Sequence, residues 1–530
     1  MGNNPSHHDD HQFVWFTLLF FIFMAYIRIE ESIRSGNSTR FILAALAGLI
    51  ASSIIILGIK WRTKNIKNLR DKQNIIEKAK DSVFSGVDEK GRHIHIKPGQ
   101  RIMHTQIVGT TNAGKTESVI LPWAIQDIAQ GRGLIIIDGK ADSGLLDKLY
   151  AYSCKHQRQS DFRLFSLMVP EKSHQFNPLE GGTPEEITER VFTSFEFENP
   201  HYRNLQFEVF SQVMRIFDAS KLVPTFQRLR NAINNPNSLM PFCDTLSDAD
   251  LKDWANHFRG LAPSDRETRT SGLLSALSHF SFGKPSSLFN TEQSHFTIES
   301  ALQQNLIVYF QLPSLLSPFL GKATGKLVLQ CFQSAIANRH RGRTDQRQFF
   351  SIFLDDFTEY LYPGFVTILN KSRSANVGVV FAHQALGDLK VLGDSVANSI
   401  LTNSNLKIFM RGNDPESAEY FSKVIGTRTG KKVTERHKLG TIHDQATGDA
   451  SVRDVEEFIV HPNCFKRDLG VGDAIMLIPH RSGTTPIRIK LSMMPDLPAM
   501  ILPDIDKRKS NSSLISTLEL NTQSPIANFN

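Results

Sequence analysis

The chain has 530 residues, of which 40% are hydrophobic and 21% are charged, so it is too long for one compact domain and too apolar for a disordered or collagen-like protein. Its four cysteines follow no C-x-x-C spacing, which indicates neither a disulfide framework nor a zinc knuckle. The net charge of +7 is not evidence for nucleic-acid binding, because residues 60–80 alone carry eight basic and two acidic side chains and the remaining residues are nearly neutral.

Two apolar stretches near the N-terminus predict a membrane-spanning helical hairpin. Phe41 to Ile59 contains no charged residue and, at about 1.5 Å per residue, is long enough for a bilayer core. Phe13 to Ile27 is equally apolar but shorter, and it spans if Ile29 is included. A cleaved signal peptide is the alternative, but no basic segment precedes this stretch and no small-residue cleavage site follows it. We expect residues 1–62 to form an anchor with transmembrane helices at about 13–29 and 41–59.

The basic segment 60–80 predicts the orientation of this anchor. Short loops rich in lysine and arginine stay on the cytoplasmic side of a membrane. We therefore expect a multi-pass membrane protein with the bulk of its chain in the cytoplasm.

A phosphate-binding loop is predicted from Gly109 to Thr116, which reads G-T-T-N-A-G-K-T between a β-type run and a helix-like segment. Glycines let the backbone N–H groups turn inward around phosphates, Lys115 can bridge the β- and γ-phosphates, and the Thr116 hydroxyl can bind Mg²⁺. The pattern predicts ATP and Mg²⁺ as cofactors, with the nucleotide held by Gly109, Thr110, Thr111, Asn112, Ala113, Gly114, Lys115 and Thr116.

A second candidate element is the apolar run Phe349 to Leu354, which ends in two acidic residues. Hydrolysis needs a carboxylate at the end of a neighbouring buried strand to hold the metal and another group to position water. We expect Asp355 to bind Mg²⁺ through its water shell and Asp356 to activate the attacking water. The alternative is a strand that simply ends in a solvated acidic turn.

Further apolar runs alternate with helix-length segments, which is typical of a doubly wound parallel sheet. Polar residues at the carboxyl ends of its strands are expected to gather around the nucleotide. Asp138, Asp355 and Gln384 stand at such ends, and Gln384 is the candidate reporter of the γ-phosphate, or else caps a loop. The predicted strands are 133–138, 306–312, 377–384, 405–410 and 473–478.

Strand signals nearly vanish between the strand that ends near Met168 and the one that starts at Leu306, and helical periodicity begins at the Thr183-Pro-Glu-Glu cap. We expect an all-α insertion domain over 183–285 whose helix-spaced aromatic residues form its core rather than a base-stacking surface. Residues 63–182 and 286–502 would form the nucleotide-binding domain. The polar segment 503–530 predicts a disordered tail or a partner-binding segment. The basic cluster Arg428, Lys431, Lys432, Arg436 and Lys438 favours a solvated loop over a surface facing nucleic acid.

Several strings together resemble the type IV secretion coupling proteins, the TraD/TraG-like conjugation ATPases. The phosphate loop looks like the family's Walker A motif, and Asp138-Gly-Lys-Ala-Asp142 like its acidic-lysine turn. The match extends over about residues 100–480 and includes Phe176-Asn-Pro-Leu179, Asn370-Lys-Ser-Arg-Ser374 and Phe381-Ala-His-Gln384.

The resemblance implies a RecA-like fold and a homo-hexameric ring at the bacterial inner membrane. It also implies three partners: relaxase-bound single-stranded DNA, the relaxosome proteins and the components of the secretion channel. Arg373 is the candidate arginine supplied in trans to the γ-phosphate. Two features depart from the family: Asp356 stands where glutamate is usual, and the loop expected outside the membrane between the two transmembrane helices, Arg28 to Arg40, is short.

The function expected from these features is an ATPase that drives DNA transfer. A nucleotide-gated receptor that recruits protein substrates and hydrolyses little ATP is the alternative, favoured by Asp356 and the polar tail. A segregation or repair translocase is a third hypothesis, but no further DNA-reading module is apparent at the C-terminus.

Overall fold

The computed structural model describes residues 81–197, 199–243, 246–342, 347–438, 445–480 and 483–505. The predicted membrane anchor, residues 1–62, lies outside this part of the chain, as do residues 506–530 of the predicted tail. Within the described ranges, no helix combines the length and the apolarity needed to cross a membrane.

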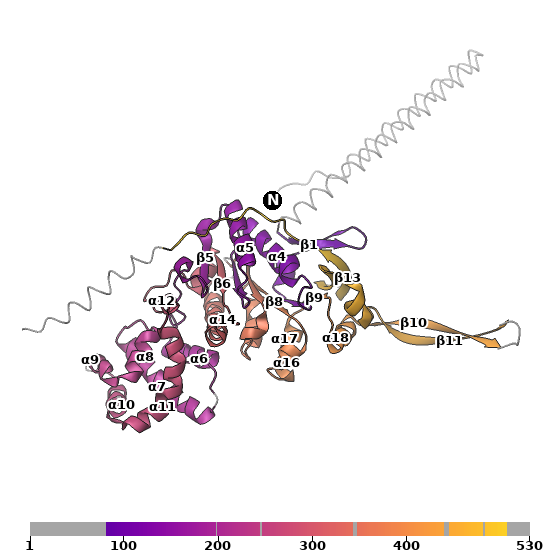
Figure 1. Ribbon diagram of the computed structural model, residues 1–530. Coiled ribbons are helices and arrows are strands. Elements are labelled where there is room, and N and C mark those ends of the chain that lie inside the picture. Colours follow the sequence, from indigo (N-terminus) through magenta and orange to yellow (C-terminus); the bar gives the residue numbers. More distant parts are fainter. Residues whose placement is uncertain are drawn as a thin grey trace, which may run out of the picture. The chain divides into compact units, whose positions relative to one another are not determined.

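A large mixed sheet organises the described residues (Figure 1). Its central strands are parallel and almost completely buried, because helices cover both faces. This parallel part has the order β9 (Leu406–Met410), β3 (Thr105–Val108), β8 (Val377–His383), β7 (Phe350–Asp355), β4 (Leu134–Asp138), β6 (Ile307–Gln311) and β5 (Phe162–Ser166).

The sheet continues beyond β9 with strands that run in alternating directions. β12 (Asp473–His480) is antiparallel to β9, so the prediction that 473–478 belongs to a purely parallel sheet is wrong. Its apolar run reflects burial, which is the same for either strand direction. The antiparallel part has the order β12, β13 (Gly483–Leu491), β1 (Val83–Asp88) and β2 (His93–Ile96).

A long antiparallel hairpin, β10 (Thr427–Lys438) and β11 (Gln445–Phe458), forms a separate two-stranded sheet (Figure 1). The basic cluster that begins at Arg428 lies on β10, so the prediction of a loop there is wrong. Opposite charges face each other across the ladder, with Arg428 paired in register with Glu457 and Lys431 with Asp454. This pairing explains why a highly charged segment forms a strand.

The two faces of the parallel sheet pack against different helices. Alternate residues of β4 point to opposite faces, so Leu134 and Ile136 join one hydrophobic cluster while Ile135 and Ile137 join the other. The first cluster contains the apolar faces of α4 (Leu121–Ala129) and α5 (Ser143–Lys155). The second contains those of α14 (Pro318–Arg341), α15 (Phe365–Ser372), α17 (Asp394–Asn403) and α18 (Pro415–Ile425).

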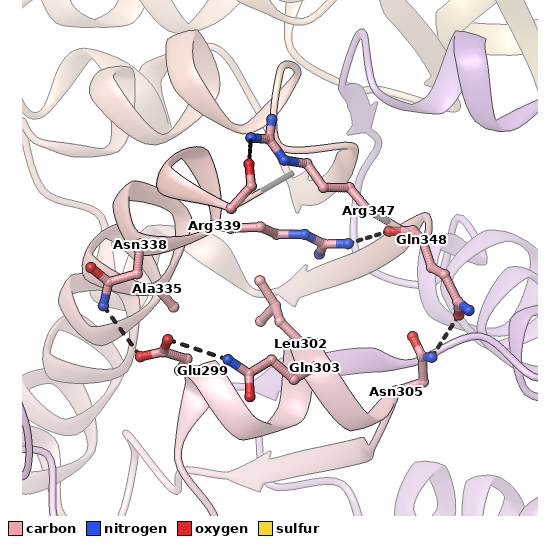
Figure 2. A pocket seen from close by; sticks show the side chains of 10 residues that line it. Glu299, Leu302, Gln303, Asn305, Ala335, Asn338, Arg339, Arg347 and Gln348 are labelled. Atoms are coloured by element: carbon pink, nitrogen blue, oxygen red, sulfur yellow. Dashed lines mark hydrogen bonds between the residues drawn. The ribbon is translucent and has the colours of Figure 1, made fainter. Parts of the chain in front are cut away.

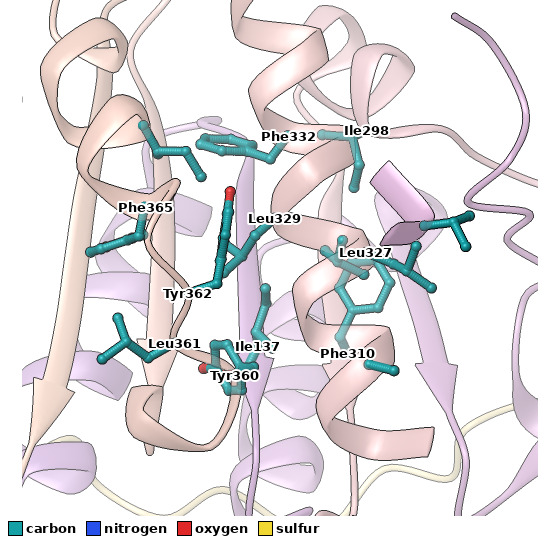
Figure 3. Close-up of a cluster of buried hydrophobic side chains, with 14 of the residues drawn as sticks. Ile137, Ile298, Phe310, Leu327, Leu329, Phe332, Tyr360, Leu361, Tyr362 and Phe365 are labelled. Atoms are coloured by element: carbon teal, nitrogen blue, oxygen red, sulfur yellow. The ribbon is translucent and has the colours of Figure 1, made fainter. Parts of the chain in front are cut away.

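Figure 3 shows the centre of the second cluster. Side chains of α14, including Leu329 and Phe332, meet Ile137 of β4 and Phe310 of β6. Tyr360 is fully enclosed, and its hydroxyl donates to the Ile137 and Asp355 carbonyls at 3.0 and 2.8 Å. The segment that follows β7 is thereby fixed to the carboxyl ends of the strands.

The predicted helical insertion is present between β5 and β6. Its first helix begins at the Thr183 capping box, as the sequence indicates. The aromatic side chains Phe192, Phe210 and Phe217 are buried in its core, in agreement with the prediction. The helices are α6 (Pro184–Ser194), α7 (Pro200–Ala219), α8 (Phe226–Asn234), α9 (Met240–Cys243), α10 (Ala249–Gly260), α11 (Pro263–Ser281) and α12 (Ser286–Phe289).

A buried ion pair joins the helix after the phosphate loop to the middle of the sheet. Arg101, at the end of α3 (Pro98–Arg101), makes two 2.7 Å hydrogen bonds to Asp127 of α4. Ser351 of β7 bonds to both partners, at 2.9 Å from Arg101 and 2.8 Å from Asp127. Neither charged side chain is exposed to solvent.

The C-terminal segment 492–505 leaves β13 and runs over α5 (Figure 1). The Tyr152 hydroxyl of α5 donates to the Pro495 carbonyl at 2.6 Å. The backbone N–H of Ile505 donates to the Glu171 carbonyl at 3.2 Å, beyond the end of β5. The segment therefore connects the antiparallel part of the sheet to the strand at the far edge.

Candidate nucleotide-binding site

The phosphate loop connects β3 to a π-helical turn, Thr116–Ile120, that leads into α4. Gly114 has φ +97°, which requires glycine, and a Cβ at Gly109 would lie 2.9 Å from the Met410 Cβ. The Gly109 N–H donates to the His383 carbonyl at 3.3 Å, and the Thr110 N–H donates to the Arg411 carbonyl at 2.9 Å. The two strands that flank β3 thus hold the start of the loop.

The Lys115 ammonium is enclosed by the loop that it terminates. It donates to the Gly109 and Thr110 carbonyls at 2.7 and 3.2 Å. Burial lowers the pKa of Lys115, and the nearby Lys140 contributes in the same direction, while the carboxylates of Asp355 and Asp356 oppose the shift. A buried ammonium at this position suits an anionic ligand.

Thr116 and Asp355 are brought into direct contact. The Thr116 hydroxyl donates to Asp355 Oδ2 at 2.7 Å. Asp355 is 2% exposed, and burial raises the pKa of its carboxyl; the hydrogen bond from Thr116 and the charge of Lys140 act against this shift. A hydroxyl and a carboxylate at this distance are the hard oxygen donors that Mg²⁺ prefers, so the residues fit a magnesium nucleotide.

The strand carrying Asp355 is not next to the phosphate-loop strand, contrary to the expectation of a neighbouring strand. β8 lies between β3 and β7 and pairs in parallel with both. The contact across this gap is made by Thr116, the first residue of the π-helical turn after the loop.

Asp356 has left-handed backbone angles, φ 46° and ψ 48°. Its carboxylate lies 3.1 Å from the Lys140 ammonium, with the two side chains 16% and 47% exposed. Burial lowers the pKa of Lys140, but attraction to Asp355 and Asp356 outweighs burial and raises it above its ordinary value. The second acid of the pair is therefore held by a lysine at the edge of the site.

Asp138 stands beside Asp355 in the parallel register of β4 and β7 and is fully buried. Its carboxylate accepts from the Lys140 and Asp142 N–H groups at 2.9 and 2.7 Å and from the Tyr309 hydroxyl at 2.7 Å. Burial raises the pKa of Asp138 to about 6. Asp138 thus fixes the turn that presents Lys140.

Gln384 lies directly after β8 and reaches the phosphate loop. Its side-chain Oε1 accepts from the Thr111 hydroxyl at 3.4 Å. The Asp388 carboxylate accepts from the backbone N–H groups of Gln384 and Ala385 at 2.8 and 3.0 Å, which fixes the turn. The other predicted catalytic residue, Arg373, is exposed at the end of α15, before β8 begins. It therefore lies at the amino edge of the sheet, away from the phosphate loop of its own chain.

Three residues that shape this site carry no clear sequence signal: Lys140, Asp388 and Arg411. Lys140 was visible only inside the Asp138–Asp142 string. Arg411 acts through its backbone carbonyl, which no side-chain pattern reveals, and Asp388 was detectable only as an acid four residues after Gln384.

A cavity of about 330 Å³ lies at the opposite edge of the sheet (Figure 2). Asn305, just before β6, and Gln348, just before β7, line it together with Arg339 of α14. Asn305 donates to Gln348 Oε1 at 2.6 Å, and Arg339 donates to the Gln348 carbonyl. These side chains bond to one another, and the cavity is not part of the site at the phosphate loop.

Two solved structures have the same fold as this chain. The solved structures of the bacterial conjugative coupling protein TrwBdeltaN70, unbound, and of the plasmid coupling protein TrwB with ADP and Mg²⁺ both superpose with a TM-score of 0.56 at 13% identity. The aligned regions cover 78% and 79% of this chain and 89% and 91% of the two solved chains. This likeness shows that the fold is that of TrwB.

Similarity in sequence extends to a curated relative. The Type 4 coupling protein DotL of Legionella pneumophila is 21% identical over 434 residues, which are 70% of this chain and 55% of DotL. The chain thus spans about half the length of this relative. The family model described as "Type IV secretory system Conjugative DNA transfer" matches residues 61–463. The chain belongs to this family, the type IV secretion coupling proteins.

Proposed function

We propose that the chain is an ATP-hydrolysing coupling protein of the bacterial inner membrane, which works as a hexameric ring. It recruits relaxase-bound single-stranded DNA and drives the DNA toward a type IV secretion channel. The observation that carries the ATPase part is the 2.7 Å contact between Thr116 and Asp355 beside a buried lysine. Membership of the family described by conjugative DNA transfer supports the DNA, relaxase and channel partners.

The chemistry assigns each group a role. Backbone N–H groups of loop 109–116 and the Lys115 ammonium bind the phosphates, while Thr116 and Asp355 hold Mg²⁺, which neutralises the charge that develops on phosphate oxygens. The Asp356 carboxylate orients and deprotonates the attacking water. Gln384 contacts the γ-phosphate region from the end of β8.

A second candidate function is a nucleotide-gated receptor for protein substrates. The ion pair between Asp356 and Lys140 at 3.1 Å favours it, because a carboxylate oxygen that contacts a lysine is less free to contact a water molecule. In this case, nucleotide binding would change the conformation of the ring and turnover would be slow.

ATP turnover of the full-length chain in mild detergent, measured with and without single-stranded DNA, separates the two functions. Turnover that DNA stimulates several-fold supports the DNA-transfer ATPase. Tight nucleotide binding without turnover supports the receptor. Lys115→Ala is expected to abolish nucleotide binding, whereas Lys423→Ala, which removes an exposed lysine of α18, is expected to leave it unchanged.

A further inference from the structure

Three buried polar side chains form a continuous chain of hydrogen bonds across β9, β3 and β8. The Lys407 ammonium lies 2.9 Å from Gln106 Oε1, and Gln106 Nε2 lies 2.9 Å from His383 Nε2. His383 Nδ1 lies 2.8 Å from the Ala385 carbonyl. The three side chains are 7%, 0% and 1% exposed, respectively.

The register of the strands places these groups on one face of the sheet. Gln106 is the parallel partner of Lys407 on one side and of Phe381 on the other, and His383 lies two residues beyond Phe381. Phe381 belongs to the hydrophobic cluster formed with α15 and α17. The polar chain therefore runs through an apolar layer, where an unmade hydrogen bond is costly.

The donors and acceptors follow a single direction along the chain. The Ala385 carbonyl can only accept, so His383 carries its proton on Nδ1. Burial lowers the pKa of His383 to about 4, so its Nε2 is unprotonated and accepts from the Gln106 amide N–H. The Gln106 amide oxygen is then directed at Lys407, which only donates.

The His383 end of this chain of hydrogen bonds reaches the nucleotide site. The backbone carbonyl of His383 accepts from Gly109 at the start of the phosphate loop, and the next residue is Gln384. The His383 ring holds the Ala385 carbonyl while Asp388 holds the N–H groups of Gln384 and Ala385. The turn that carries Gln384 is thus fixed from both sides.

The Lys407 end of this chain of hydrogen bonds is anchored on α17. Lys407 also donates to the Leu401 carbonyl at 2.8 Å and to the Ser404 hydroxyl at 3.3 Å, at the carboxyl end of α17, where a cation is favoured. Together with the Gln106 amide oxygen, Lys407 therefore has three hydrogen-bond partners, and all three are uncharged oxygens. Burial lowers the pKa of Lys407 to about 8, which reflects the cost of this desolvated position.

We propose that Lys407, Gln106 and His383 form a relay that positions Gln384 beside the phosphate loop for the hydrolysis step, an inference that rests on the ATPase function proposed above. The relay joins the end of α17 to the nucleotide site through the interior of the sheet. Lys407 and Gln106 are positioning residues, because they act on Gln384 only through His383.

The test compares two relay variants with a matched control in the full-length chain. Lys407→Met and Gln106→Leu interrupt the relay at different links. Gln175→Leu is the control, because Gln175 is also a buried glutamine whose Nε2 donates one 2.8 Å bond, to the Ser287 carbonyl, between β5 and the helical insertion. Thermal unfolding of all variants measures the loss of stability that they share.

Steady-state kinetics give the first readout. Both relay variants are expected to lower kcat roughly 10- to 100-fold, with KM and ADP affinity within about threefold of wild type, because a small displacement of a positioned group has an effect of this order. Gln175→Leu should retain kcat. Relay variants that turn over ATP like wild type, or that lose only stability to the same extent as the control, would overturn the relay.

Hydrogen–deuterium exchange gives a second readout that does not require turnover. In the relay variants, the amides of residues 383–388 are expected to exchange faster than in wild type, while the control leaves them protected. If the wild-type protein does not hydrolyse ATP, the proposed function is refuted. The relay would then be tested by hydrogen–deuterium exchange of residues 383–388 alone. Unchanged protection of 383–388 would overturn it.

Discussion

Asp356 occupies a left-handed backbone position that few residue types adopt easily, and its carboxylate is paired with Lys140. Asparagine tolerates the left-handed region and has nearly the same shape, so Asp356→Asn removes the base without straining the turn. Loss of a general base lowers turnover by about 10²- to 10⁴-fold, so we expect a fall in kcat of this size with nucleotide affinity retained.

Rapid-quench kinetics and binding of a fluorescent ADP analogue measure the two parts of this prediction. Glu359→Gln is the control, because Glu359 lies on the same turn but pairs with Lys322 at 3.4 Å. Turnover by Asp356→Asn equal to that of wild type would mean that another group activates water.

Two buried histidines make the protein sensitive to acid. Burial lowers the pKa of His104 and of His383 to about 4, from an ordinary value of 6.5. Between pH 6.5 and 4, the unfolded chain binds more protons than the folded one, so each histidine reduces the free energy of unfolding by about 1.4 kcal/mol per pH unit on acidification. Asp138, with its pKa raised to about 6, acts in the opposite sense between pH 6 and 3.8.

The net expectation is a loss of stability below pH 6, and His104→Gln should make this loss shallower. The midpoint of thermal unfolding at pH 6.5, 5.5 and 4.5 measures it for both proteins. Identical pH dependence in wild type and His104→Gln would show that His104 does not remain neutral in the folded protein.

At the scale of elements, the ion pair between Arg101 and Asp127 fixes α4 to β7. Asp127→Asn leaves the Arg101 guanidinium buried between Trp123 and Phe349 without a charged partner. Breaking a buried pair in this way costs about 3–5 kcal/mol, whereas replacing both partners by apolar residues costs far less. We therefore expect Asp127→Asn to unfold at much lower urea concentration than the double variant Arg101→Met, Asp127→Leu. Equal urea midpoints for the single and the double variant would show that the unpaired Arg101 charge does not cause the loss of stability.

The sequence predicts some elements well and others poorly, for physical reasons. Buried strands such as β7 and β8 are continuous apolar runs, and the phosphate loop has a strict local pattern. The direction of β12 and the position of β8 between β3 and β7 depend on contacts between distant segments, which no local pattern records. The strand β10 was missed because its cross-strand partners, not its own composition, stabilise it.

The residues of the candidate site also divide into those that a local sequence motif predicts and those that only distant contacts reveal. Thr116 and Asp355 were predicted from their motifs, and the structure brings them to 2.7 Å. The relay residues Gln106 and Lys407 carry no motif, since each looks like an ordinary polar residue within an apolar strand. Only the parallel register of β3 with β9 reveals that they meet.

At the scale of the whole molecule, the position of Arg373 predicts shared sites. Arg373 lies at the amino edge of the sheet and the phosphate loop at the carboxyl edge, so Arg373 can act on phosphate only at the site of another subunit. We expect Arg373→Ala to bind nucleotide but not hydrolyse it. Mixing it with Lys115→Ala should restore activity on the order of a quarter of wild type, since random assembly of a ring leaves that share of interfaces intact.

Turnover of the mixture, compared with each variant alone, measures this recovery. A mixture as inactive as its components would exclude Arg373 as the residue supplied by a neighbouring subunit.

The segment 492–505 has a mechanical consequence for the assembled protein. A load applied to the C-terminal end of the chain is carried first by the bond from Ile505 to Glu171 and then by the bond between Tyr152 and Pro495. Beside these bonds, Met494, Leu497 and Leu502 pack against the hydrophobic cluster that contains α4 and α5, so a pull is shared among several separate contacts before β13 is disturbed. Asp496 of the same segment contacts Lys148 of α5, which also contacts Glu117 beside Thr116, so one lysine links the C-terminal segment to the end of the phosphate loop.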